Sequence, residues 1–226
     1  MEHDRIYFNS KKAVPDLLSY LKERLDDSTG FYETIVPMLQ VQHFDRAKII
    51  AKAGEMGLVA FWLQLGYARC FTASIDEEGL RQEKTTDFCS PNKILVITES
   101  FFGGMPSRFN VQLSAGAVVV PFPRHAFDFL KSMAPGVEAL ANKILALDKP
   151  EGQEKTIMQG MKPRERYREF LRFFGAGIEQ YFAIKHIASY LNMTPTFLSR
   201  LRGELYKNKT DLKKYLQTIF FILNLG

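Results

Sequence analysis

The sequence predicts an α+β fold in which an antiparallel β-roll of the jelly-roll kind is flanked by helices and followed by a long connecting helix and a small helical domain. Two observations support this prediction. Short apolar and β-branched runs, separated by turn-like stretches, follow one another from residue 36 to residue 122, and connections this short suit antiparallel strands. Apolar residues at helical spacing precede this region and return after it.

The first 34 residues are expected to be mostly helical, because leucines recur at helical spacing at positions 17, 18, 21 and 25. Strands are expected within the apolar runs that follow: 36–44, 46–53, 57–74, 80–88, 93–99, 108–114 and 117–122. Asp76 to Gly79 predicts the tip of a long hairpin, with Gly79 supplying a positive φ. The runs together predict a sandwich or barrel of seven or eight short strands.

Helical periodicity returns near Pro123 and is interrupted by Pro135. An apolar stripe then continues at positions 137, 140, 141, 144 and 145, and it is either a dimer seam or ordinary core. Pro150 and Gly152 predict a bend or a break in this helix. Further helices are expected at 163–174, 183–191 and 195–206, and the apolar end of the chain is expected to be helical and to pack on the protein or a partner.

These elements divide the chain into three predicted units. Residues 1–133 form a β-roll domain, residues 134–161 form a connecting helix, and residues 162–226 form a small helical domain.

Composition excludes several classes of protein. Apolar residues make up 46% of the 226 residues and charged residues 24%, so the chain can bury a core. No long uncharged apolar run occurs, and Asp4 and Arg5 stand where a signal peptide would begin. We therefore expect a cytoplasmic protein with no membrane span. Cys70 and Cys89 are the only cysteines, which excludes a disulfide scaffold, a four-cysteine zinc site and an all-cysteine iron–sulfur cluster.

Motifs for catalysis are also missing from the sequence. It has no P-loop, no dinucleotide fingerprint and no Gly-x-Ser-x-Gly elbow. Its histidines share no metal-ligand spacing; they stand at positions 3, 43, 125 and 186. We expect neither enzymatic activity nor a cofactor or metal.

Charge is distributed unevenly along the chain. Residues 161–226 hold 12 Lys and Arg against 5 Asp and Glu, whereas residues 1–160 hold 18 against 20. A basic tail on a mildly acidic body favours a polyanionic partner, because each cation placed near a phosphate releases a condensed counterion. A basic face that only keeps the protein soluble is the alternative.

The segment from Ala183 to Arg202 predicts a helix-turn-helix. Small Ala188 allows a second helix to cross closely, and Asn192 stands at the turn, where a left-handed backbone is needed. Thr194 is a good N-cap and Pro195 suits the first helical position. The second helix would then resemble a recognition helix whose early residues enter a major groove. An ordinary helical hairpin shares the apolar spacing and is the alternative.

The predicted partner is double-stranded DNA. Arg200 is the candidate for a bidentate contact to guanine O6 and N7. The hydroxyl side chains on the same face would contact phosphates or base edges: Thr194, Thr196 and Ser199. The basic side chains around them would add phosphate contacts with little sequence preference: Lys185, His186, Arg202 and Lys207.

The order of elements and two motifs resemble the Crp/Fnr family of bacterial transcription regulators, and its Bacteroidetes branch in particular. The motifs are Glu165–Leu171 and the stretch from Ile187 to Arg202. The resemblance implies a cyclic-nucleotide-binding-like sensor domain, a homodimer formed through the long helix, and two recognition helices that read a roughly palindromic site.

The sequence departs from this family at the nucleotide pocket. Asn92-Lys93 replaces the family's Gly-Glu pair, and Phe109 and Asn110 follow Arg108 where small residues are usual. A lysine cannot accept the hydrogen bond of a ribose hydroxyl, so we do not expect cyclic AMP to bind in the usual way. Lys93 and Arg108 are instead candidates for binding another anionic small-molecule effector. Cyclic-nucleotide binding through an unorthodox pocket is a further alternative.

The sequence thus predicts a homodimeric, sequence-specific DNA-binding regulator without enzymatic activity. The competing hypothesis is a ligand-binding or protein-interaction module with the same fold that no longer reads DNA.

Overall fold

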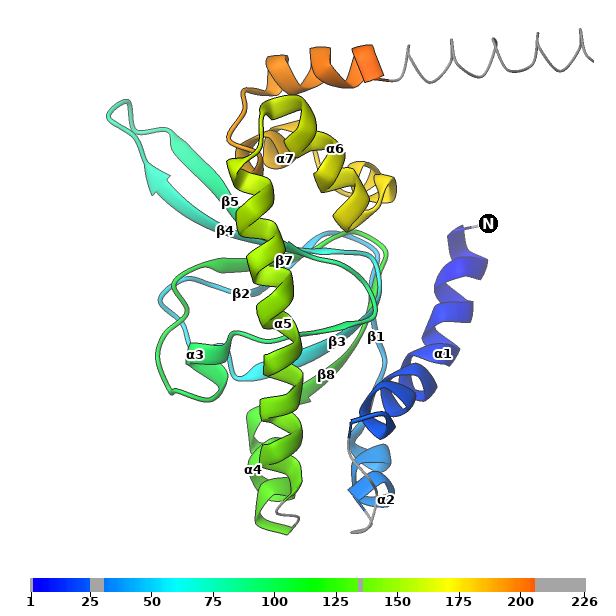
Figure 1. Cartoon of the computed structure of the whole chain (residues 1–226). Helices are drawn as coiled ribbons and strands as arrows, with labels where there is room; N and C mark the ends of the chain where they lie inside the picture. Colours follow the sequence, from blue (N-terminus) through cyan, green and yellow to red (C-terminus); the bar gives the residue numbers. More distant parts are fainter. Residues whose placement is uncertain (1, 25–30, 134–135, 206–226) are drawn as a thin grey trace, which may run out of the picture.

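The structure is a computed structural model, and it describes residues 2–24, 31–133 and 136–205. Figure 1 shows a central pair of sheets with the long helix α5 (Gly136–Gly160) running along them. Helices α1 and α2 lie on one side, and the small C-terminal helices gather at one end. Among the described residues, no helix combines the length and the apolar character needed to cross a bilayer.

The N-terminal region is helical, as predicted. It contains α1 (Glu2–Lys22), α2 (Phe31–Ile35) and the short 3-10 helix η1 (Val36–Met38). One face of α1 is buried against the sheets through Ala13, Leu17 and Leu21. Leu25 of the predicted stripe lies outside the described residues.

Within the described residues, eight strands form two four-stranded antiparallel sheets. The strands are β1 (Gln42–Phe44), β2 (Lys48–Ala51), β3 (Val59–Leu65), β4 (Ala68–Ile75), β5 (Arg81–Cys89), β6 (Lys93–Leu95), β7 (Asn110–Leu113) and β8 (Ala117–Pro123). Their order is β1-β8-β3-β6 in one sheet and β2-β7-β4-β5 in the other. This is the antiparallel roll that the spacing of apolar runs predicts.

The long apolar run 57–74 is in fact two strands. Gly66 separates β3 from β4 with φ 85°, and a Cβ there would lie 2.7 Å from the Ser114 Oγ. Six of the seven residues of β3 are apolar because the strand is covered on both faces: Leu63 packs between the sheets, and Trp62 packs beneath α1. Continuous apolar character therefore reflects two-sided burial.

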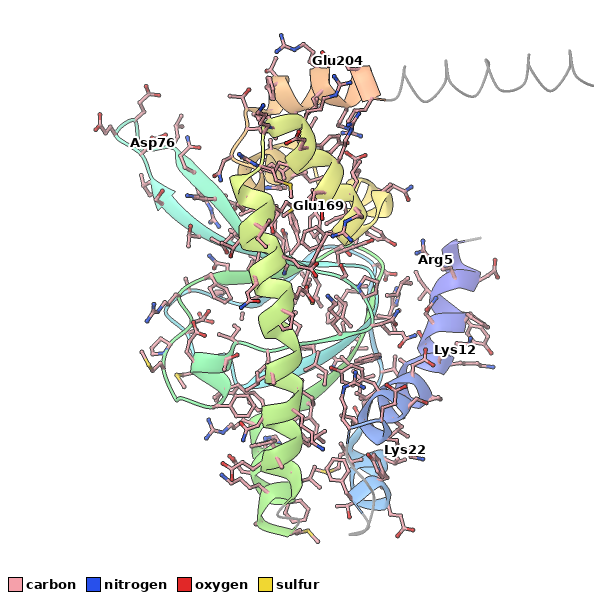
Figure 2. The ribbon with its side chains drawn as sticks, in the orientation of Figure 1. Arg5, Lys12, Lys22, Asp76, Glu169 and Glu204 are labelled. Atoms are coloured by element: carbon pink, nitrogen blue, oxygen red, sulfur yellow. The ribbon has the colours of Figure 1, made fainter. Side chains whose placement is uncertain are left out.

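The β4–β5 hairpin forms at the predicted residues. Asp76 caps its tip, since its carboxylate accepts hydrogen bonds from the backbone N–H groups of Glu78 and Leu80 at 3.1 and 2.8 Å. Gly79 has φ 77°, as expected. Figure 2 shows Asp76 at the end of this hairpin, away from the body of the molecule.

Two short helices, α3 (Thr98–Phe101) and α4 (Arg124–Met133), precede α5. Pro150 and Gly152 do not break this helix, because α5 is one helix from Gly136 to Gly160; a bend there, the other expectation, stays a prediction. Pro150 removes one backbone donor, but the following turns are tied to the sheet by the pairs Lys93–Glu151 and Lys155–Asp87. These tertiary contacts offset the local preference.

The apolar stripe of α5 belongs to the core of its own chain. Val137 and Leu140 are buried, and Ile144 packs against the same cluster as Leu17 and Trp62. For these residues the structure supports the interpretation of the stripe as core and not as a dimer seam. Homodimer formation remains a prediction, and the structure does not identify a surface for it.

The C-terminal helices are α6 (Pro163–Phe174), the 3-10 helix η2 (Ala176–Gln180), α7 (Ile184–Tyr190) and a last helix over residues 195–205. The three helices predicted at 163–174, 183–191 and 195–206 lie within a residue or so of their expected ranges. They share one apolar cluster with Tyr67 and Phe88 of the roll and with Met158 of α5. The boundaries of the three predicted units remain predictions.

Candidate nucleic-acid interface and ligand pocket

A tight turn joins α7 to the 195–205 helix. Asn192 has φ 51°, the left-handed backbone expected at this position. Ala188 is fully buried, and its carbonyl accepts a hydrogen bond from the Met193 N–H at 2.9 Å. The small side chain lets the two helices approach, and the asparagine lets the chain reverse.

The 195–205 helix begins as the sequence predicts. The Thr194 Oγ1 accepts a hydrogen bond from the Phe197 N–H at 3.2 Å, which satisfies one of the free donors of the first turn. Pro195 occupies the first helical position, where no amide donor is required.

The two faces of this helix differ in burial. Leu198 and Leu201 are buried in the C-terminal cluster. The opposite face is exposed and carries Thr196, Ser199, Arg200 and Gly203. The Arg200 guanidinium lies 5.4 Å from the centre of the Phe197 ring, and Arg200 forms no ion pair with any described residue. Figure 2 shows this helix, marked by Glu204, at the end of the molecule away from the sheets.

The other basic residues predicted to contact DNA differ in exposure and in ion pairing. Lys185 on α7 is exposed. Arg202 is partly exposed, and its Nε lies 3.0 Å from the Glu179 Oε1, so its charge is shared with a carboxylate. Lys207 and the apolar C-terminal segment lie outside the described residues.

His186, unlike Lys185, is partly buried and faces the roll. Its imidazole Nδ1 contacts the guanidinium of buried Arg69 on β4, and that guanidinium also pairs with the Glu83 Oε2 at 2.7 Å. Burial, then the charges of Arg69 and Lys185, lower the pKa of His186 to about 4, against a smaller opposing effect of Glu83. The ring is therefore neutral at pH 7, and the expectation of a cationic phosphate contact does not fit this arrangement.

The lowered pKa predicts a pH-dependent stability. An unfolded histidine binds its proton near pH 6.5, so acid favours the unfolded chain. The stabilising effect of the neutral ring is complete above about pH 6.5 and is lost as the pH falls toward about 4. We expect the free energy of unfolding to fall less steeply over this range in His186→Asn, which keeps an acceptor for Arg69. Urea titrations along a pH series check this; parallel pH profiles of the two proteins would contradict it.

The left-handed backbone at Asn192 gives a second prediction. Asn192→Ala is expected to lower the free energy of unfolding by about 1 kcal/mol relative to Asn192→Gly, because alanine is strained at positive φ and glycine is not. Both variants lose the hydrogen bond from the Asn192 amide to the Gln159 Oε1, so their difference isolates the backbone effect. Thermal and urea unfolding measure it, and equal stability of the two variants would be inconsistent with a left-handed turn.

A junction between the roll and the C-terminal helices is the feature that sequence reasoning missed. Phe88 is fully buried, and its ring lies 5.0 Å from that of Phe182 and 5.2 Å from that of Tyr190. The Thr85 N–H donates to the Ser189 Oγ at 3.0 Å. One phenylalanine at the end of an otherwise polar strand, Arg81 to Asp87, is the sequence signal that could have indicated this contact.

Lys93 and Arg108 line the same pocket, which has a volume of about 730 Å³ and lies between the roll and α5. Lys93 forms an ion pair with Glu151 of α5. Arg108 is exposed and forms no ion pair within the part of the chain that the structure describes. The sequence therefore identified two residues of one pocket, but not the helix that faces them.

Both signs of charge line this pocket. The Lys155 Nζ lies 2.8 Å from the Asp87 Oδ1 and 3.4 Å from the Glu151 Oε1. Phe109 and both cysteines also border it. Burial raises the pKa of Cys89 to about 12 and raises that of Cys70 as well, so both thiols are protonated at neutral pH. The pocket presents charged and apolar groups side by side.

Solved structures share this architecture. FixK2 from Bradyrhizobium japonicum is similar with a TM-score of 0.60 at 16% sequence identity, over 76% of this chain and 86% of that one. A CRP-family transcriptional regulator from Thermus thermophilus gives 0.55 at 19% identity, over 74% and 85% of the two chains. A cyclic nucleotide-binding domain containing protein from Listeria monocytogenes gives 0.56 at 16% identity, over 86% and 91%.

No protein-family model and no curated protein matches the sequence. The chain has a Crp/Fnr-like fold, and the predicted α+β class with a cyclic-nucleotide-binding-like roll and flanking helices is confirmed. Identities this low show the fold alone.

Proposed function

We propose that this protein is a sequence-specific DNA-binding transcription regulator of the Crp/Fnr type, acting on DNA in the cytoplasm, and that α7 and the 195–205 helix are its helix-turn-helix. The observation that carries the proposal is the outer face of the 195–205 helix. It is capped at its start by Thr194, and it presents Thr196, Ser199 and Arg200 to solvent. A helix of this kind fits the major groove of B-form DNA.

The exposed residues have separate roles in this proposal. Arg200 reads a guanine through its two guanidinium donors, while Thr194, Thr196 and Ser199 contact phosphates or base edges. Lys185 and Arg202 add phosphate contacts, which strengthen binding to any sequence. His186 is left out, because its ring is neutral and contacts Arg69.

The proposal has two further parts, the formation of a homodimer and the binding of a small-molecule effector. A homodimer would place two recognition helices one helical turn of DNA apart and so read a roughly palindromic site. The pocket lined by Lys93 and Arg108 is the proposed effector site, because Arg108 offers a cation beside apolar walls, with no ion pair to any residue that the structure describes.

Selection from a pool of random duplexes with the full chain tests the proposal. We expect enrichment of one roughly palindromic sequence, and an affinity for it that falls steeply between about 50 and 200 mM salt. Absence of any duplex bound better than the random pool would overturn DNA reading. That outcome would favour the second candidate, a ligand-binding or protein-interaction module, which the junction of α7 with the roll through Phe88 also suits.

A further inference from the structure

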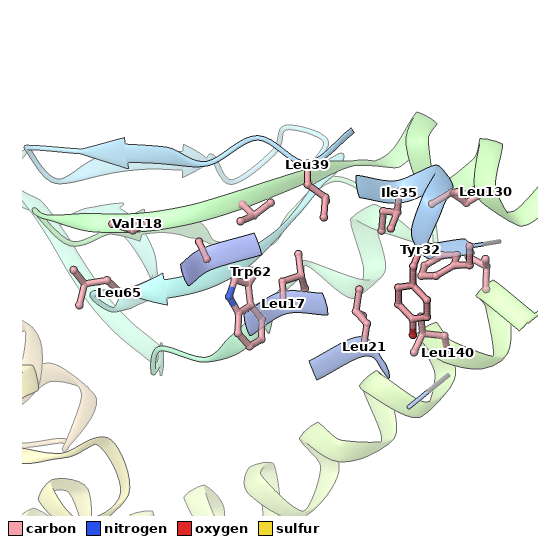
Figure 3. Packing of buried hydrophobic residues seen from close by; sticks show 14 residues of the cluster. Leu17, Leu21, Tyr32, Ile35, Leu39, Trp62, Leu65, Val118, Leu130 and Leu140 are labelled. Carbon is pink, nitrogen blue, oxygen red and sulfur yellow. The ribbon is translucent and has the colours of Figure 1, made fainter. Parts of the chain in front are cut away.

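A second cavity, of about 100 Å³, lies on the other side of the roll from the C-terminal helices. It is lined by residues of α1, α2, β3, β6, α3, β8, α4 and the first half of α5. Figure 3 shows several of its walls, with Leu17 and Leu21 from α1, Trp62 from β3 and Leu140 from α5. Only Ile94 and Val96 border both this cavity and the Lys93–Arg108 pocket, so the two sites are distinct.

The cavity is walled mostly by buried side chains and is open to solvent in part. Many of its wall side chains are nearly inaccessible to solvent, with 5% exposure for Leu17, 4% for Trp62, 2% for Leu130 and 5% for Leu140, while others, such as Ala141 and Ile144 of α5, are half-buried. A helix of a second copy does not fit a volume of about 100 Å³, whereas one aromatic ring or a short alkyl chain does. The size therefore selects a small molecule.

The chemistry of the walls selects an uncharged, apolar molecule. Every residue that lines the cavity has an apolar or aromatic side chain. The indole N–H of Trp62 donates to the Gln64 Oε1 at 2.7 Å, and the Gln64 amide donates to the Asp16 Oδ2 at 2.7 Å. This donor is therefore already satisfied. A water molecule needs two to four polar partners, so an all-carbon cavity favours apolar occupants.

We propose that this cavity is a binding site for a small, uncharged apolar molecule such as a single aromatic ring or a short alkyl chain. The walls provide carbon contacts, and the ligand gains by leaving water. A polar analogue of the same size is rejected, because its hydroxyl would be buried without a partner. The inference does not depend on DNA binding.

Trp62 makes the test direct, because it is the only tryptophan of the chain. We expect benzene to change its fluorescence in a saturable way and to raise the midpoint of thermal unfolding of the full-length protein. Phenol is expected to bind at least about tenfold more weakly. Wild-type protein with no saturable response to benzene, or with equal affinity for phenol, would overturn the proposal.

A matched pair of variants locates the site. Ala141 lines the cavity from α5, while Ala139 stands on the exposed side of the same helix. Ala141→Leu is expected to fill the space and abolish the response to benzene, and Ala139→Leu is expected to keep it. Benzene binding by Ala141→Leu equal to that of the wild type would place the site elsewhere.

A second measurement covers the case in which Ala141→Leu does not fold. Nuclear Overhauser effects between benzene and the methyl groups of the wild-type protein identify the contacts without any variant. We expect contacts to the methyl groups of Leu17, Leu21 and Leu140, and contacts confined to other parts of the chain would refute the assignment.

Discussion

Phe88→Ala is expected to lower the free energy of unfolding by about 3–5 kcal/mol, the usual cost of removing a large buried ring and leaving a cavity. Phe88 is fully buried on β5, and its ring meets four others from the C-terminal helices, at centroid distances of 5.0–5.9 Å: Phe170, Phe174, Phe182 and Tyr190. These rings come from α6, α7 and the segment before α7, so the Phe88 side chain lies at the centre of the contact between the roll and the C-terminal helices.

The same substitution is expected to loosen the C-terminal helices selectively. Hydrogen exchange in α6 and α7 should increase more than exchange in the sheets, because the lost contacts lie at their junction. Phe101→Ala is the matched control, since Phe101 is 2% exposed and packs against Phe102 and Phe127, far from α7 in the chain. It should destabilise the fold without this preference. Equal protection of α6 and α7 in the two variants would show that Phe88 does not hold the junction.

Elements that depend on neighbours in the chain could be predicted from the sequence. The hairpin at Asp76, the left-handed Asn192 and the cap at Thr194 are satisfied by atoms only a few residues away. Turn and cap preferences are properties of the local chain, so residue types alone were sufficient there.

Features that depend on distant residues could not be predicted in the same way. Pro150 looks like a helix break until the ion pairs of the next turns are known, and Lys93 meets Glu151 across 58 residues of sequence. His186 resembles a surface cation beside a basic helix, yet burial against Arg69 keeps it neutral. In each of these cases a tertiary contact overrides the local preference.

The difference in exposure between His186 and Arg200 reduces the number of residues in the proposed DNA-binding surface. Both are basic residues of the predicted helix pair, but His186 faces β4 while Arg200 is exposed. The proposed site therefore rests on the 195–205 helix, with Lys185 and Arg202 at its margin. Arg200 is the exposed arginine of this set, and its guanidinium can distinguish a guanine by a two-donor contact, whereas the Arg202 guanidinium pairs with Glu179.

Arg200→Ala is accordingly expected to reduce the preference for the selected site over a scrambled duplex by about 1–3 kcal/mol, with the fold unchanged. Fluorescence anisotropy titrations with both duplexes measure this preference. Arg200→Lys is the matched control: it keeps the positive charge, and with it the salt dependence and the affinity for scrambled DNA, but lysine lacks the planar pair of donors. The control should therefore lose discrimination nearly as fully as the alanine variant. Wild-type discrimination in Arg200→Ala would remove Arg200 from the reading role, and full discrimination in Arg200→Lys would show that charge alone accounts for it.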